Sequence, residues 1–171
     1  MRVFTVGHST RTLDELISLL NTHSIELLVD VRSIPRSFTN PQFNRETIEI
    51  ELPKRGIRYM WLEKIGGLRR GFGKLSKNTC WRNRSFRNYA DHMETVEFEE
   101  GINELLQLAK DCMTVIMCAE TLYWRCHRTM IADFLKSKGV QVTHIISEKE
   151  TREHEYSQCV KIRNGILTYQ D

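Results

Sequence analysis

The sequence predicts an α/β protein built on a Rossmann-like, mainly parallel sheet of about five strands, with helices on both faces and a C-terminal β-hairpin. Two observations favour this class. Short apolar runs of strand length alternate with helical patterns along most of the chain, and such alternation is typical of parallel sheets joined by crossover helices. Near the end, Asn164-Gly165 separates two short runs, which is a strong signal for a two-residue hairpin turn.

The individual elements follow from local patterns. The expected strands are the apolar runs at residues 3–6, 27–31, 57–62, 114–118 and 140–146, with a hairpin at 160–169. The expected helices begin after Thr12, at Arg45, after Ser85, near Phe98 and at Cys126. Thr12 and Glu15 fit a capping box, and Gly139 stands where a C-terminal cap belongs. The charged stretch 147–157 is expected to be exposed. No repeat or linker interrupts the 171 residues, so we expect a single domain over residues 1–171.

Composition narrows the functional classes. No apolar run approaches the roughly 20 residues of a membrane span, and the N-terminal segment lacks the features of a signal peptide. We therefore expect a cytoplasmic protein with no membrane partner. The five cysteines are an odd number in a chain without a signal peptide, which argues against a structural disulfide framework.

Positive charge is concentrated in one segment. Between Lys54 and Arg87 the chain has eleven Lys and Arg residues and one acid, a net charge of +10, whereas the rest carries −7. Much of this charge lies on a Gly-rich basic loop, residues 64–84, that has no clear periodicity. Cations can grip phosphates and aromatic faces can stack on bases. The candidate nucleic-acid surface comprises Lys64, Arg69, Arg70, Phe72, Lys74, Trp81, Arg82 and Arg84. The alternative is a solvated basic surface.

Polar side chains follow several of the expected strands. In a parallel sheet these strand ends share one edge, where open α/β proteins bind ligands. The expected substrate- or anion-binding residues at this edge are Ser9, Asp30, Arg32, Ser37, Tyr59, Gly66, Gly67, His127 and Arg128. We expect Arg128, Arg32 and the backbone amides near Cys126 to hold phosphate.

The stretch from Cys118 to Arg128 has the densest chemistry. Cys118 and Cys126 are candidate nucleophiles or redox thiols, and Glu120 and His8 are candidate proton carriers. Their alternatives are packing cysteines, an ion-pair carboxylate and a structural histidine. A zinc site from Cys118, Glu120, Cys126 and His127 can be drawn, but zinc ligands normally come in closer pairs, so we expect no metal and no cofactor.

A phosphatase or sulfurtransferase loop is another candidate for this stretch. Arg125 lies seven residues after Cys118, whereas the phosphatase cradle has five residues between cysteine and arginine, which argues against that class. Asp30-Val31-Arg32 is similar to the early Asp-x-Arg of sulfurtransferase domains, although many buried strands end in this way.

Several motifs together resemble the domain of unknown function 488 family, from Val3 to about Ile146. The motifs are Gly7-His8-Ser9, residues 30–37, Gly56-Ile57-Arg58-Tyr59, Gly66-Gly67 and Cys118-Ala119-Glu120 with Cys126-His127-Arg128. The resemblance implies a Rossmann-like α/β domain and no established activity. Family members often have proline where Tyr123 stands, so the loop geometry can differ here.

These observations favour an enzyme acting on a nucleotide, nucleobase or nucleic-acid-linked substrate in a pocket at the carboxyl edge. The partner is then a phosphate-bearing small molecule or a nucleic acid. Two alternatives stay open, namely a non-catalytic nucleic-acid-binding module and a thiol redox or sulfur-transfer protein. The sequence does not indicate the oligomeric state.

Overall fold

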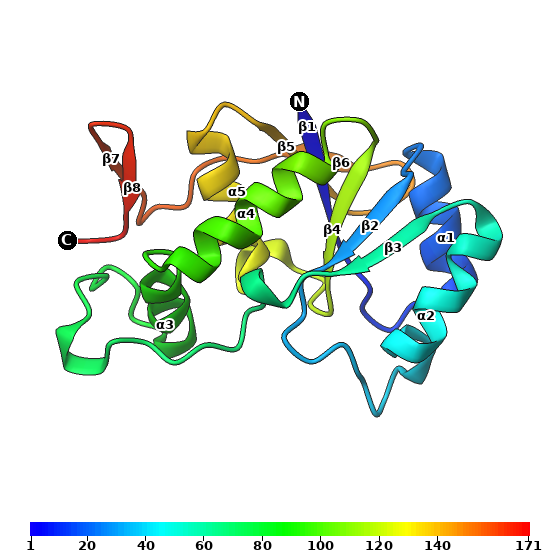
Figure 1. Cartoon of the computed structure of the whole chain (residues 1–171), viewed down its shortest axis with the longest axis horizontal. Helices are drawn as coiled ribbons and strands as arrows, with labels where there is room; N and C mark the ends of the chain where they lie inside the picture. The colour runs from blue at the N-terminus through cyan, green and yellow to red at the C-terminus, as the bar shows by residue number, and fades with distance from the viewer.

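The computed structural model describes residues 1–171 and has a central six-stranded sheet (Figure 1). The strands lie in the order β3-β2-β4-β1-β5-β6. Five are mutually parallel: β1 (Arg2–Gly7), β2 (Leu27–Asp30), β3 (Arg58–Trp61), β4 (Thr114–Cys118) and β5 (Gln141–Ile145). The sixth, β6 (Thr151–Glu153), is antiparallel to β5. The predicted fold class is confirmed.

Five α-helices cover the two faces of the sheet. They are α1 (Leu13–Thr22), α2 (Arg45–Glu51), α3 (Arg84–His92), α4 (Val96–Leu108) and α5 (Arg128–Ser137). Short 3₁₀ turns occur at Pro41–Phe43, Pro53–Arg55, Glu63–Ile65, Gly73–Leu75 and Tyr123–Arg125. Helices α1 and α2 lie on one side of the sheet, and α3, α4 and α5 lie on the other (Figure 1). This split follows from the topology, because the chain moves along the sheet in one direction before β3 and in the other after it.

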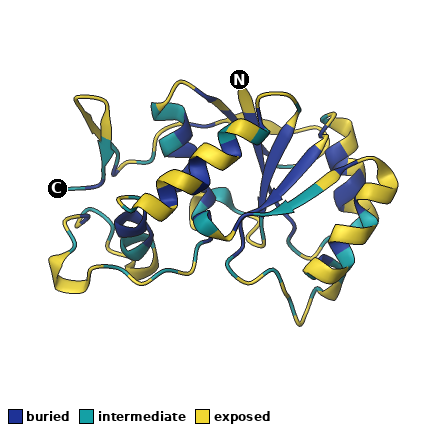
Figure 2. Ribbon diagram, viewed as in Figure 1, coloured by how far each residue is buried: buried dark blue, intermediate teal, exposed yellow.

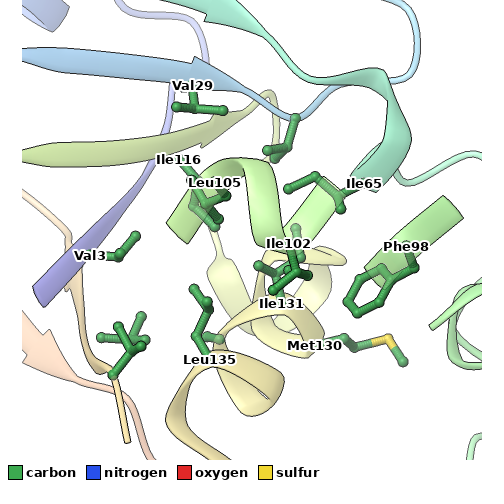
Figure 3. Close-up of a cluster of buried hydrophobic side chains, with 14 of the residues drawn as sticks. Val3, Val29, Ile65, Phe98, Ile102, Leu105, Ile116, Met130, Ile131 and Leu135 are labelled. Carbon is green, nitrogen blue, oxygen red and sulfur yellow. The ribbon is translucent and has the colours of Figure 1, made fainter. Parts of the chain in front are cut away.

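Each face of the sheet has its own hydrophobic core. In Figure 2 the central strands and parts of the helices that face them are coloured as buried. On one face, Leu16 and Leu20 of α1 and Ile48 of α2 pack against strand residues such as Val115. On the other, residues of α4 and α5 meet β1, β2 and β4 (Figure 3), and the labelled members are Val3, Val29, Ile65, Phe98, Ile102, Leu105, Ile116, Met130, Ile131 and Leu135. Central strands buried on both faces explain the apolar runs in the sequence.

Helix capping agrees with the sequence at α1 and differs at α3. The hydroxyl of Thr12 accepts from the Glu15 amide at 3.1 Å, and the Glu15 carboxylate accepts from the Thr12 amide at 2.7 Å, which forms the predicted capping box. The cap of α3 is Asn83, not Ser85. Its side-chain oxygen accepts from the amides of Ser85 and Phe86 at 2.9 and 3.3 Å, and Asn is at least as good a cap as Ser.

The charged stretch 147–157 was expected to be exposed, but part of it is buried. It contributes β6 and the buried His154, whose Nε2 lies 2.9 Å from a carboxylate oxygen of buried Asp133. His154 Nδ1 lies 2.9 Å from His144 Nε2, and the hydroxyl of Thr5 lies 2.7 Å from His144 Nδ1. Tyr123 stacks on His144 at 3.6 Å between ring centres. This buried polar chain joins the last third of the protein to the sheet.

The predicted hairpin is present as β7 (Lys161–Arg163) and β8 (Ile166–Thr168), which form a separate two-stranded sheet. Asn164 and Gly165 both have positive φ, 51° and 75°, as a type I′ turn requires. The buried Tyr169 follows β8 and donates from its hydroxyl to Asp133 at 2.9 Å. The hairpin is therefore anchored at its base while its strands stay largely exposed.

The expectation of no structural disulfide is wrong for one pair. Cys80, at the end of the basic loop, is bonded to Cys159, just before the hairpin, across a sequence separation of 79 residues. The odd cysteine count did not exclude one bond, and only the tertiary structure brings these two residues together. Cys112, Cys118 and Cys126 remain free thiols. None of the helices has the length and apolar character needed to cross a membrane.

Candidate functional site

The site lies where the sheet changes its direction of winding. β1 and β4 are neighbours, yet β1 leads to α1 on one face and β4 leads to the helix α5 on the other. Loops that diverge in this way leave a crevice at the carboxyl ends of the strands. Gly7 and Cys118 are paired in register at this edge, and the His8 amide donates to the Cys118 carbonyl at 2.9 Å. His8 and Cys118 therefore lie side by side at the position expected for a site in an open α/β protein.

Two thiols and an imidazole converge in this crevice. His127 Nδ1 lies 3.9 Å from Cys118 Sγ and 3.6 Å from Cys126 Sγ. All three potential ligand atoms lie within 4.8 Å of one another. Cys118 comes from the last position of β4, while Cys126 and His127 directly precede α5, which begins at Arg128 and not at Cys126.

The ring of His127 is held from two sides. Its Nε2 lies 2.9 Å from the Val31 carbonyl and must donate to it, which leaves Nδ1 directed to the two sulfurs. A side-chain carbon on Gly67 would lie only 2.5 Å from Nδ1. Glycine is therefore required at position 67 so that the basic loop can close over the ring, and this explains the Gly-Gly motif.

Arg128 is buried behind the thiols, with only 1 % of its surface exposed. Its Nε donates to Cys126 Sγ at 3.4 Å, and its Nη2 donates to the backbone carbonyl of Glu120. The amides of Thr129 and Met130 already donate to the carbonyls of Cys126 and His127. The Arg128 guanidinium thus donates to a thiol and to a backbone carbonyl inside the protein. Few hydrogen-bond donors remain at the start of α5 for the phosphate that was expected to bind there.

The pKa values of the two neighbouring thiols are shifted in opposite directions. The hydrogen bond with Cys126 and burial raise the pKa of the Cys118 thiol well above its ordinary value. The hydrogen bond with Cys118, together with the neighbouring His127 and Arg128, lowers the pKa of the Cys126 thiol well below its ordinary value. We therefore assign the thiolate to Cys126, where two cationic or donor groups face it.

A buried ion pair forms the other wall of the crevice. Arg32 donates from Nε and Nη2 to the two carboxylate oxygens of Asp30 at 2.8 and 2.6 Å, and from Nη2 to the Phe43 carbonyl at 2.7 Å. The hydroxyl of Tyr59 donates to Asp30 at 2.7 Å, and burial raises the pKa of that hydroxyl. Asp30 and Tyr59 therefore orient Arg32, whose remaining Nη1 points to His8.

His8 is a neutral imidazole with a defined tautomer. Its Nδ1 lies 2.8 Å from the Ser9 carbonyl and must donate to it, so Nε2 accepts from Arg32 Nη1 at 3.3 Å. The ring stacks on Phe43 at 4.4 Å. Burial, together with the charge of the adjacent Arg32, lowers the pKa of His8 to about 4. The lone pair on His8 Nε2, with which this residue was expected to carry protons, therefore already accepts a hydrogen bond from the Arg32 guanidinium.

This environment predicts a pH-dependent stability. Between pH 4 and about 6.5 the unfolded chain binds a proton at His8 that the folded protein does not, so the contribution of neutral His8 is full above about pH 6.5 and is lost as the pH falls through 4. On going from pH 7 to about 4.5, wild type should lose about 2 kcal/mol more unfolding free energy than His8→Asn. Urea titrations at both pH values measure this difference, and parallel pH profiles would contradict it.

Cavities surround the sulfur centre. One, of about 310 Å³, includes His8, Arg32, Cys118 and His127 in its lining. A second, of about 390 Å³, includes Glu120, Cys126 and His127, and both cavities share Gly67 and Leu68. A third, of about 490 Å³, includes Ser9, Ser37 and Glu120. The cluster of Cys118, Cys126 and His127 thus borders both of the first two cavities, with His127 lining each of them.

The remaining predicted site residues occupy different roles. The Glu120 carboxylate is exposed and accepts from the Leu122 amide at 3.1 Å, so it is not part of the sulfur cluster. Gly66 lies against Ser33, whose hydroxyl accepts from the Leu68 amide at 2.8 Å. Ser37 accepts at its hydroxyl from the Asn40 amide at 3.0 Å and lines two of the cavities.

The basic loop is ordered by a buried carboxylate that the sequence did not single out. Asp91 of α3 accepts from the Phe72 amide, the Ser76 hydroxyl and the Asn78 amide group at 2.8, 2.6 and 2.9 Å. Phe43, which stacks on His8, was also missed. Neither residue carries a local signal, because each acts through partners that are distant in sequence.

The candidate nucleic-acid surface divides into committed and free groups. Lys64 pairs with Glu100, and Arg69 pairs with Glu97 and donates to the Gly66 carbonyl. Trp81 stacks on Phe86 at 4.9 Å, which occupies one face of its ring. Phe72 is exposed. Four cations are exposed and form no salt bridge: Arg70, Lys74, Arg82 and Arg84.

The chain matches a model of a known protein family. The family model described as "Domain of unknown function DUF488" matches residues 12–135, which is more than half of the chain. The chain belongs to the DUF488 family. The match contains Asp30, Cys118 and Cys126 but begins after His8, so the expected extent of the resemblance is reduced at both ends. No curated protein and no solved structure matches the chain.

Proposed function

We propose that this DUF488 protein is a cysteine-dependent enzyme that acts on a phosphate-bearing substrate, either a nucleotide or a nucleic-acid-linked group. The observation that carries the proposal is the partition of Cys118, Cys126 and His127 between two adjoining cavities at the carboxyl edge of the sheet. Burying a low-pKa thiol beside Arg128 is costly for a purely structural purpose, and such perturbed groups cluster at functional sites.

The nature of the substrate is inferred from the basic loop. Both ends of this loop border the second cavity, through Gly67 and Leu68 at one end and through Asn83 and the following Ser85 and Phe86 at the other. The free cations at Arg70, Lys74, Arg82 and Arg84 belong to the same loop. An anionic ligand drawn to these cations would be guided to the cavity that contains Cys126.

Apolar side chains beside the cavities favour a ligand with a base. Ile34 and Leu68 line the first cavity and are 64 % and 74 % exposed, and Phe38, which is almost fully exposed, lies on the same loop as Ile34. Exposed apolar side chains around a polar site are typical of ligand-binding surfaces. A nucleobase offers a face for these side chains, whereas inorganic phosphate does not.

Binding should depend on the free cations of the loop. We expect Lys74→Gln/Arg82→Gln/Arg84→Gln to bind a fluorescent single-stranded oligonucleotide more weakly than wild type. Each phosphate contact contributes about 0.7 to the slope of log affinity against log salt. The triple variant should therefore reduce that slope by up to about 2, as measured by fluorescence anisotropy over a range of salt concentrations.

The matched control is Lys110→Gln/Lys149→Gln/Lys161→Gln, which removes the same charge from exposed lysines outside the basic segment. It should keep the wild-type slope. Equal loss in both triple variants would contradict a specific role for the loop. If no nucleotide or oligonucleotide binds or raises the melting temperature, the substrate assignment fails.

Turnover separates an enzyme from a binding module. Wild type incubated with nucleotides and short oligonucleotides should give a new product by mass spectrometry, and Cys126→Ser should give none. Cys112→Ser should retain activity, because Cys112 is a free thiol that contacts Leu108 and Thr114 at the base of β4. Binding without turnover, unchanged in Cys126→Ser, would favour the non-catalytic alternative.

A further inference from the structure

We propose that Cys118, Cys126 and His127 form a zinc site with three protein ligands and one open coordination position. Zinc accepts this ligand set, and catalytic zinc sites in proteins typically have three protein ligands and an exchangeable fourth. The site stands on its own geometry and does not depend on the identity of the substrate.

The ligand spacing fits tetrahedral zinc. With Zn–S bonds of about 2.3 Å and Zn–N bonds of about 2.0–2.1 Å, the ligand atoms of a tetrahedral site lie about 3.5–3.8 Å apart. The distances from His127 Nδ1 to the sulfurs of Cys126 and Cys118 are 3.6 and 3.9 Å. The two sulfurs lie within 4.8 Å of each other. A metal ion could therefore enter with shifts of at most about 1 Å.

The surroundings of the ligands match those of a metal site. Metal-binding histidines usually donate their other ring N–H to a carbonyl or carboxylate, which fixes the tautomer. His127 does this through Nε2 and the Val31 carbonyl, so that Nδ1 faces the sulfurs and can give its lone pair to a metal ion. The Arg128 Nε–H donates to Cys126 Sγ, as a group supporting a zinc-bound thiolate would.

The fourth position is free of protein ligands. Glu120, the fourth candidate ligand in the sequence, has its carboxylate outside the cluster and lines the second cavity together with Cys126. Water or a substrate atom entering from either cavity could complete the coordination. A metal at such a position polarises a bound oxygen and lowers the pKa of bound water.

The competing interpretation is a redox dithiol, in which Cys118 and Cys126 lose two electrons to an oxidant and form a disulfide. His127 distinguishes the two cases. A dithiol pair does not need an imidazole nitrogen in line with both sulfurs, and His127 is held in that position by a carbonyl on one side and by a glycine-only approach on the other.

Metal content and cobalt spectroscopy test the proposal on the full-length protein. After dialysis against Zn²⁺, elemental analysis should find about one zinc per chain. Co²⁺ alone should produce thiolate-to-cobalt charge-transfer bands and the intense visible bands of tetrahedral cobalt. Cys118→Ser, Cys126→Ser and His127→Gln should each lose at least tenfold in affinity for Co²⁺, whereas Cys112→Ser should match wild type.

A measurement on wild type guards against variants that fail to fold. Zn²⁺ should protect Cys118 and Cys126 from alkylation, mapped by mass spectrometry, and should leave the alkylation rate of Cys112 unchanged. The proposal is overturned if Zn²⁺ protects neither cysteine, or if His127→Gln is folded and binds Co²⁺ as tightly as wild type. Zinc uptake is measured without substrate, so failed nucleotide binding would leave this result intact, and the reverse also holds.

Discussion

Replacing Asp30 with Asn should lower the free energy of unfolding by about 3–5 kcal/mol, because it leaves the buried Arg32 without its counter-charge. Arg32 is 5 % exposed and Asp30 is fully buried, and two side-chain hydrogen bonds join them. An asparagine of the same shape keeps one acceptor for Arg32 or Tyr59 but cannot neutralise the guanidinium. Urea unfolding followed by circular dichroism measures the loss.

The control for this variant is Asp14→Asn. Asp14 pairs with Arg55 at the surface, where its side chain is 83 % exposed, so the change should cost less than about 1 kcal/mol. A loss in Asp30→Asn as small as that of the control would show that Arg32 can find another partner or reach water. Zinc content of Asp30→Asn should stay near that of wild type, since neither Asp30 nor Arg32 contacts the sulfurs directly.

Asp133→Ala should destabilise the protein by about 3 kcal/mol or more, through loss of the acceptor that fastens the C-terminal segment. Asp133 is fully buried and accepts from His154 Nε2, from the amide and hydroxyl of Ser157, and from the Tyr169 hydroxyl. Each buried donor left without a partner costs about 1–3 kcal/mol. Chemical denaturation measures the total effect.

The location of the damage gives a second readout. Amides in residues 154–171 should exchange with deuterium faster in Asp133→Ala than in wild type. The exchange rates of amides in β1 and β4 should change much less. Asp111→Ala is the matched control, because Asp111 is exposed, and it should stay within about 0.5 kcal/mol of wild type. Uniformly faster exchange, or a loss below about 1 kcal/mol, would mean that Asp133 does not act as the anchor of this segment.

Local chemistry made most of the fold predictable. The capping box at Thr12, the five parallel strands and the Asn164-Gly165 turn each depend on residues close in sequence, and each is confirmed. The short antiparallel β6 was missed because its three residues are all exposed and carry no apolar signal. β6 pairs with β5 because β5 is the last of the parallel strands and its outer edge has no other strand beside it.

The sequence by itself determined the α/β class and the edge at which the chemistry-bearing residues gather, because hydrophobic periodicity and the alternation of strands and helices along the chain are local properties. The tertiary structure decided which of those residues act together. It placed Cys118, from β4, within 3.9 Å of His127, and it kept Glu120 outside the cluster. It also turned Arg128 toward a sulfur and paired Cys80 with Cys159. Such contacts depend on the packing of elements that are far apart in sequence, and spacing along the chain does not specify them.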